Sequence, residues 1–187
     1  MTAGSGIIHQ EMPNPEVAPI AGFQLWVNLP RAHKMMPPRY QDILPAQIPT
    51  ALHDGARVKI IAGSWQGTAG PVSDLMVGPM YLDVTLDADK IFSCQLPETD
   101  TALVYIYEGT AAVASPQHQI VAGTVVLLTH GKEIKIHAIG GAVRFLVISG
   151  KPIGEPVAWH GPIVMNTQEE LRGAFAEIEA GTFIKKQ

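Results

Sequence analysis

A histidine and a carboxylate lie two residues apart near the start of the chain, in the stretch IIHQEM at residues 7–12. Side chains at this spacing project from one face of a strand, so His9 and Glu11 would point the same way. A neutral imidazole and a carboxylate together suit Fe(II), Mn or Zn, but a metal needs at least three protein ligands. The spacing leaves two interpretations open: half of a metal site, or two polar residues on an exposed strand.

The other residues that could carry chemistry are scattered along the chain. Cys94, in IFSCQLP, has no adjacent histidine or basic residue to lower its pKa, which favours an idle thiol over a nucleophile. GSG at residues 4–6 is interpreted as a turn, because no Lys-Ser/Thr follows it. The spacing predicts no catalytic residue and no residue binding an organic cofactor. Six further histidines lack metal-ligand spacing and are interpreted as surface or core residues: His33, His53, His118, His130, His137 and His160.

Composition excludes several classes of function. The net charge of −4 supplies no basic surface for a nucleic-acid backbone, so direct nucleic-acid binding is disfavoured. A single cysteine excludes an internal disulfide and fits a reducing compartment. No signal peptide is visible, and apolar runs stay far below the roughly 20 residues of a membrane span. We therefore predict a cytoplasmic protein without membrane contact, with a nuclear location open if the source is eukaryotic.

Most of the chain has the pattern of short strands. Residues 7–12 and 23–30 are predicted strands, and residues 31–55 are a proline-rich crossing segment whose apolar residues we expect to pack. From residue 56 to 149, strand candidates follow one another between Gly, Pro and Asp, which predicts an antiparallel sandwich or barrel. The candidates are RVKIIAGS, MYLDVTL, ALVYIYEG, AAVAS, HQIVAG, TVVLLT, EIKIHAI and AVRFLVIS.

A helix is predicted over residues 167–180. Thr167 and Glu170 have the spacing of a capping box, and Gly181 stands where a C-terminal cap would. One apolar stripe at i, i+3, i+4 and i+7 predicts that the helix docks on the β domain. The stripe consists of Leu171, Ala174, Phe175 and Ile178.

Three stretches resemble the pirin family: MTAGSGIIHQEMP, FQLWVNLPRAHKMMPPRYQDI and GPIVMNTQEELRGAFAEI, the last preceded by the run Gly-Lys-Pro-Ile-Gly-Glu-Pro-Val at 150–157. The resemblance covers nearly the whole chain and implies a bicupin. It predicts an all-β fold in which residues 1–30 are remnant strands of an N-terminal cupin. Residues 31–55 would be the crossing linker, and residues 56–187 a C-terminal cupin, an antiparallel β-barrel or jelly roll, with its closing helix.

The resemblance also implies a metal, usually iron, in the N-terminal cupin. The family's ligands are the two histidines of a His-Pro-His motif and a later His-x-Glu pair, which His9 and Glu11 match. The first pair has no counterpart, so we expect a chain that is N-terminally truncated relative to the family. The C-terminal cupin reads IFSCQLPETDTALVYIYEG at the equivalent of the ligand motif, without paired histidines.

Three functions stay open on this basis. One is an iron-dependent quercetin 2,3-dioxygenase acting on flavonol-like molecules, with the missing ligands supplied from elsewhere. Another is a non-enzymatic, regulatory partner of other proteins, and the third is a truncated, metal-free paralogue. A partial barrel exposes strand edges and apolar side chains, so we also expect a homo-oligomer formed through residues 1–30. The apolar side chains concerned are Ile7, Ile8, Phe23, Leu25, Trp26 and Val27.

Overall fold

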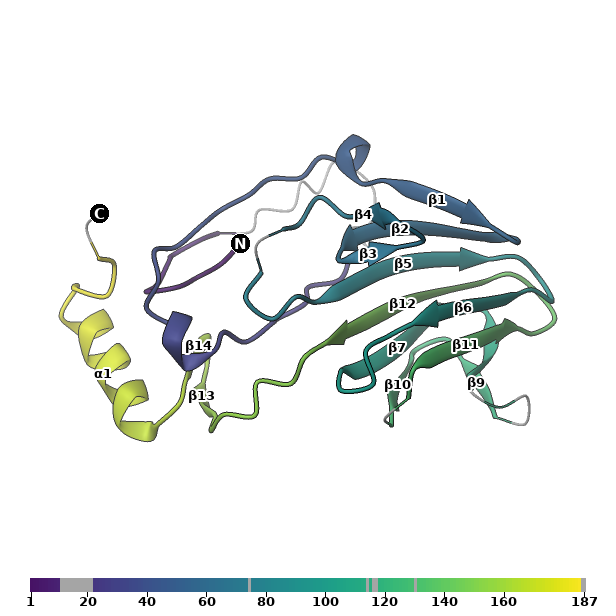
Figure 1. Ribbon diagram of the computed structural model, residues 1–187. Helices are drawn as coiled ribbons and strands as arrows, with labels where there is room; N and C mark the ends of the chain where they lie inside the picture. The colour runs from purple at the N-terminus through teal and green to yellow at the C-terminus, as the bar shows by residue number, and fades with distance from the viewer. Residues whose placement is uncertain (11–21, 74, 114, 116–117, 130, 186–187) are drawn as a thin grey trace. The chain divides into compact units, whose positions relative to one another are not determined.

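The structure is a computed structural model that describes residues 1–10, 22–73, 75–113, 115, 118–129 and 131–185 (Figure 1). These residues form two compact units. The terminal unit comprises Met1–Gln41 and Ile153–Gln187, and the central unit comprises Asp42–Pro152. Within the described ranges, no helix combines the length and the apolar character needed to cross a membrane.

The central unit consists of two antiparallel sheets and a small hairpin (Figure 1). The six-stranded sheet has the order β1-β2-β5-β12-β7-β10. Its strands are β1 (Thr50–His53), β2 (Ala56–Ala62), β5 (Met80–Leu86), β12 (Val143–Gly150), β7 (Thr101–Glu108) and β10 (Thr124–Leu128). The four-stranded sheet has the order β6-β11-β8-β9. Its strands are β6 (Ile91–Gln95), β11 (Glu133–Ala138), β8 (Thr110–Val113) and β9 (Gln119–Val121). The hairpin joins β3 (Ser64–Trp65) to β4 (Thr68–Ala69).

Alternation along the strands builds the core of the central unit. In β2, Val58 and Ile60 are buried while Arg57 and Lys59 are exposed, because successive side chains of a strand point to opposite faces. Three aromatic rings connect the hairpin and the two sheets, with Trp65 stacked on Phe92 and Phe92 meeting Phe145 edge to face. The ring of Phe92 from β6 lies 5.7 Å from that of Trp65 and 5.5 Å from that of Phe145 in β12.

The terminal unit has a second, smaller core. Its elements are the 3₁₀ helix η1 (Arg31–His33), the hairpin of β13 (Ala158–His160) with β14 (Ile163–Met165), and the helix α1 (Gln168–Glu179). Helix α1 packs on this hairpin, with Ala158, Ile163 and Leu171 buried between them. Of the predicted stripe, Leu171, Ala174 and Phe175 belong to this core of the terminal unit, whereas Ile178 is 45% exposed.

The predicted fold class is confirmed in its mainly β character and in the α-helix near the C-terminal end of the described residues. The helix bounds, the capping box and the cap at Gly181, whose φ is +69°, also agree with the prediction. The predicted domain boundaries of 1–30, 31–55 and 56–187 stay predictions.

Two stretches differ from the expected local structure. Residues 7–10 and 22–29 form no strand, although their sequences suit one, because a strand requires a paired neighbour. The crossing segment contains η1, a second 3₁₀ helix η2 (Pro45–Gln47) and β1. Its packing is partial: Met36, Ile43 and Ile48 are half-buried, whereas Tyr40 and Leu44 are exposed.

Candidate functional site

The segment that leads to His9 is held by backbone hydrogen bonds. The Thr2 N–H donates to the Arg39 carbonyl at 2.7 Å, and the Arg39 N–H donates back to Thr2 at 2.9 Å. The Ser5 N–H donates to the Met36 carbonyl at 2.8 Å. Residues 2–5 are therefore attached to the crossing segment just after η1.

Two glycines allow this close approach. Gly4 has a φ of +53°, and a Cβ there would collide with the carbonyl oxygen of Met36. Gly6 lies against the ring of Phe183, which would be only 2.6 Å from an added Cβ. The GSG motif is thus a turn whose glycines are required by close packing.

His9 follows directly on this anchored stretch and its side chain is exposed. Glu11, the other half of the predicted pair, lies outside the described residues, so the pairing of His9 with Glu11 stays a prediction. Among the residues that the structure describes, no group of three or more His, Cys, Asp or Glu side chains converges as a metal site would require.

The interior of the central unit is apolar where β6 and β12 face each other. Cys94 of β6 is 3% exposed, and its Sγ lies 3.6 Å from the Sδ of Met80. Burial raises the pKa of the Cys94 thiol to about 11, which disfavours the thiolate at neutral pH. This is the environment of an inert, packed thiol, as the sequence around Cys94 suggested.

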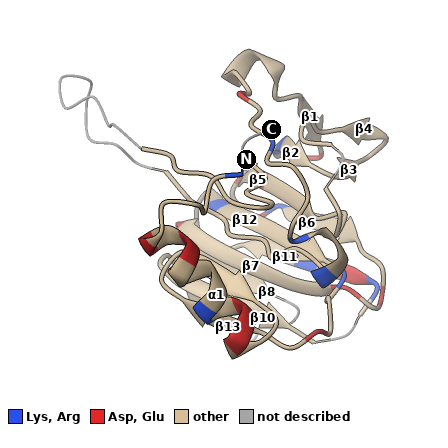
Figure 2. Cartoon of the chain, turned by 90° about the vertical axis from the view of Figure 1, so that its left-hand side faces the viewer, with Lys and Arg blue, Asp and Glu red and all other residues tan. Residues whose placement is uncertain are grey.

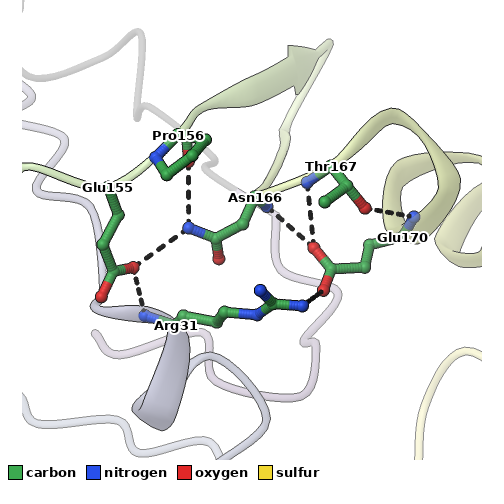
Figure 3. Close-up of polar contacts among 6 residues, drawn as sticks. All are labelled: Arg31, Glu155, Pro156, Asn166, Thr167 and Glu170. Atoms are coloured by element: carbon green, nitrogen blue, oxygen red, sulfur yellow. Dashed lines mark hydrogen bonds and ion pairs between the residues drawn. The ribbon is translucent and has the colours of Figure 1, made fainter.

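The start of helix α1 is the centre of a polar network in the terminal unit (Figure 3). Thr167 Oγ1 accepts from the Glu170 N–H, and Glu170 Oε2 accepts from the Thr167 and Asn166 N–H groups at 3.0 and 3.1 Å. Glu170 Oε1 also pairs with Arg31 Nη2 at 2.8 Å. Although burial opposes it, these backbone hydrogen bonds and the Arg31 charge lower the pKa of Glu170. The capping box therefore also binds the first residue of η1.

A second carboxylate closes this network from the other side. Glu155 Oε2 accepts from the Arg31 N–H at 2.7 Å and from Asn166 Nδ2 at 3.0 Å. The same Asn166 amide donates to the Pro156 carbonyl at 2.9 Å, so Asn166 lies between the two carboxylates (Figure 3). Asn166 is buried, and its Oδ1 lacks a hydrogen-bond partner among the described residues.

A buried lysine attaches the crossing segment to β14. Lys34 is 6% exposed, and its Nζ donates to Asn28 Oδ1 at 2.7 Å and to the Val164 carbonyl at 3.1 Å. Burial lowers the pKa of Lys34, and the negative charges of Glu155 and Glu170 oppose this. Hydrogen bonds from Lys34 and Arg31 thus hold residues 28–34 against the segment that precedes α1.

Sequence reasoning found only part of this network. The capping-box spacing identified Thr167 and Glu170, but Arg31 and Lys34 were only part of a proline-rich segment. Both lie in the motif NLPRAHK, and the other quoted motif, VMNTQEE, contains Asn166 and Glu170. The two stretches therefore meet in space, through Arg31 with Glu170 and Lys34 with the Val164 carbonyl.

A polar cluster also lies on the six-stranded sheet of the central unit. The Tyr107 hydroxyl donates to Asp83 Oδ1 at 2.5 Å, and the Arg144 guanidinium lies 4.8 Å from the centre of the Tyr107 ring. Burial and the hydrogen bond to Asp83 raise the pKa of Tyr107. The cluster joins β5, β7 and β12 and keeps the Tyr107 hydroxyl protonated.

Comparison with known proteins places this fold and these motifs in a class. The family profile described as "Pirin C-terminal cupin domain" matches residues 81–184, and the profile "Pirin" matches residues 1–27. The central unit with its two antiparallel sheets is thus a cupin. The chain belongs to the pirin family.

Several relatives show the extent of the likeness. A "Pirin-like protein" of Caulobacter vibrioides is 42% identical over 185 residues, which are 98% of this chain and 66% of the relative. A Thermoplasma acidophilum protein named "Putative quercetin 2,3-dioxygenase Ta0133" is 36% identical over 206 residues, covering 100% of this chain and 78% of the relative. The chain thus spans about two thirds to three quarters of the length of these curated relatives.

Solved structures agree with this assignment. The crystal structure of quercetin 2,3-dioxygenase from Acinetobacter baumannii has a TM-score of 0.79 and 32% identity, over 84% of this chain and 55% of that one. The structure of GK1651 from Geobacillus kaustophilus has a TM-score of 0.65 and 28% identity, over 71% of this chain and 54% of that one. The chain therefore corresponds to about half of each of these structures.

Proposed function

We propose that the chain is part of a pirin-type quercetin 2,3-dioxygenase, in which His9 and Glu11 are two ligands of an iron ion and the substrate is a flavonol-like molecule. The observation that carries the proposal is the likeness to the Acinetobacter baumannii quercetin 2,3-dioxygenase, at 32% identity and a TM-score of 0.79. The name of the Thermoplasma relative supports the same activity. The cytoplasmic location predicted from the sequence belongs to this proposal.

In such a site, the described residues would hold the segment that carries His9 in place, and they would supply only part of the ligand set. His9 follows a stretch that is hydrogen-bonded to residues 36–39. These residues come shortly after η1, and there Arg31 and Lys34 bind Glu170 and the Val164 carbonyl. The remaining ligands would come from outside the described residues, from a preceding segment of a longer gene product or from a second subunit. Under this proposal, activity requires these further ligands in addition to His9 and Glu11.

Metal content and quercetin turnover test the proposal on the purified chain. We expect iron close to one equivalent when the site is complete, and loss of both iron and quercetin consumption in His9→Ala. His33→Ala is the matched control, because His33 is also an exposed histidine of the terminal unit. Iron content that His9→Ala leaves unchanged would refute the ligand assignment. The reading frame upstream of Met1 shows independently whether a His-Pro-His run precedes it.

A second candidate is a metal-free, regulatory partner of other proteins. It is favoured by the large exposed apolar side chains of the terminal unit, which include Ile8, Trp26 and Val27. The predicted homo-oligomer through residues 1–30 would use the same side chains. Metal content near zero, together with unchanged quercetin, would favour this candidate or a metal-free paralogue over the dioxygenase.

A further inference from the structure

Strand β10 (Thr124–Leu128) ends the six-stranded sheet and presents an uncharged edge. In the described part of the chain it pairs with β7 and with no other strand. Its sequence, TVVLL, contains no charged residue and no proline, so the strand carries no charge colour in Figure 2. Val125 and Leu127 are 59% and 70% exposed, while Val126 and Leu128 pack against the core.

Such an edge is unusual for a chain that remains a single copy. Sheet-end strands have unpaired N–H and C=O groups, and proteins usually protect them with charged residues, proline or a bulge. The opposite end of the same sheet, β1, is only four residues long, contains His53 and is followed by Asp54. Strand β10 is only one residue longer, but it contains no charged residue, histidine or proline and has two exposed aliphatic side chains.

We propose that two copies of the chain associate by antiparallel pairing of β10 with β10, centred on Val126. The two-fold axis of such a pair is perpendicular to the sheet, so both copies keep the same face outward. Residues directly opposite each other in an antiparallel pair point to the same face of the sheet. The two-fold axis must therefore pass between the two copies of one residue and not between two peptide positions. Centring on Val126 pairs all five residues and places Val125 opposite Leu127 of the second copy.

The register within each sheet extends this contact. Val125 lies opposite Tyr105 of β7, and Leu127 lies opposite Leu103. Across the new pair, one row would therefore run from Tyr105 and Val125 to Leu127 and Leu103 of the second copy. The row contains no charged residue, so no like charges meet, and the symmetry creates the same row twice. The edge is thus complementary to itself, which identifies a second copy as the occupant.

Sedimentation equilibrium of the full chain tests the proposal, which is independent of any bound metal. We expect a concentration-dependent dimer and expect Leu127→Lys to raise its Kd by about tenfold or more, because two lysines would enter the apolar rows. Leu52→Lys is the matched control, because Leu52 is 73% exposed on the opposite sheet-end strand. Circular dichroism confirms that both variants fold, and Leu127→Gln repeats the test without a charge.

Two outcomes would overturn the β10 dimer. One is a chain that stays monomeric at the highest concentration reached. The other is a dimer that Leu127→Lys leaves intact. If Trp26→Lys instead dissociates that dimer, the contact is formed through residues 1–30.

A cysteine pair tests the register itself. Opposite residues in antiparallel strands have Cα atoms about 4.5–5.5 Å apart, within the range that a disulfide spans. Val125→Cys and Leu127→Cys, each purified separately, should therefore cross-link when mixed under mild oxidation. Neither variant should cross-link by itself, because position 125 of one copy lies opposite position 127 of the other and the two introduced cysteines are then not opposite each other. Cross-linking of a single variant, or none in the mixture, contradicts the register centred on Val126.

Discussion

Raising the pH should destabilise the chain through the buried thiol of Cys94. Its side chain lies inside the central unit, 3% exposed, and burial raises its pKa from 9.0 to about 11. In the unfolded chain the thiol ionises near its ordinary pKa, while in the folded chain it stays protonated. The folded state therefore binds more protons between about pH 9 and 11, and stability falls as pH rises through this window.

The size of the effect follows from the two pKa values. With pKa values of 9.0 unfolded and about 11 folded, the loss in free energy of unfolding is about 1 kcal/mol at pH 10 and about 2 kcal/mol at pH 11. Below pH 8 the loss is close to zero. The protonated Cys94 thiol thus leaves the free energy of unfolding unchanged at neutral pH, and its ionisation in the unfolded chain lowers this free energy in alkali.

Urea unfolding at several pH values, on the natural chain and on Cys94→Ala, isolates this contribution. The raised pKa values of Tyr81 and Tyr107 also lower stability in alkali, but they act equally in both proteins and cancel in the difference. We expect the stability difference between the two proteins to change by about 2 kcal/mol between pH 8 and 11. A difference that stays constant over this range would refute the assigned environment of Cys94.

Three further changes test other parts of the structure. Thr167→Ala should lower the free energy of unfolding of the terminal unit by about 1 kcal/mol in urea titrations, whereas Thr167→Ser should retain most of the cap; equal losses would argue against the capping box. Phe92→Ala should lower the free energy of unfolding by about 3–5 kcal/mol, and Phe92→Leu by clearly less, in the same urea titrations. A loss below about 1 kcal/mol for Phe92→Ala would contradict the packing of Phe92 between Trp65 and Phe145. Because burial lowers the pKa of Lys34, the unfolded state binds more protons just below pH 10.5, so Lys34 makes stability rise with pH there. Lys34→Met removes this contribution, so the stability of the variant should fall more steeply than that of the natural chain as the pH approaches 10.5 in urea titrations. Identical pH profiles of the two proteins would exclude this burial.

The two units differ in where they place apolar and polar residues. In the central unit, the rings of Trp65, Phe92 and Phe145 connect the two sheets, and Cys94 lies in the same core. The interior of this unit is filled by apolar side chains. The His-x-Glu motif and the carboxylate network both belong to the terminal unit.

Local pattern was sufficient wherever the nearest neighbours in the chain decide the structure. The alternation of RVKIIAGS and MYLDVTL predicted β2 and β5, since a strand with one buried face must alternate. Thr167 and Glu170 lie within one helical turn of each other, so their reciprocal capping could be predicted from spacing alone. The missed strands include β1, β13 and β14, because three or four residues contain too little alternation to recognise. They also include β6, whose five residues IFSCQ alternate in burial but were not recognised as a strand.

Tertiary structure decided the features that depend on distant residues. Residues 22–29 have the composition of a strand but form none, since strand formation depends on a neighbour that local sequence does not specify. Arg31 lies 139 residues from Glu170 in sequence, and Lys34 lies 130 residues from Val164, so neither contact leaves a local signal. The sequence by itself determined the family, most of the longer strands of the central unit and the candidate pair of His9 and Glu11. Only the folded chain showed that its two signature motifs bind each other, because hydrogen bonds and ion pairs require proximity in space.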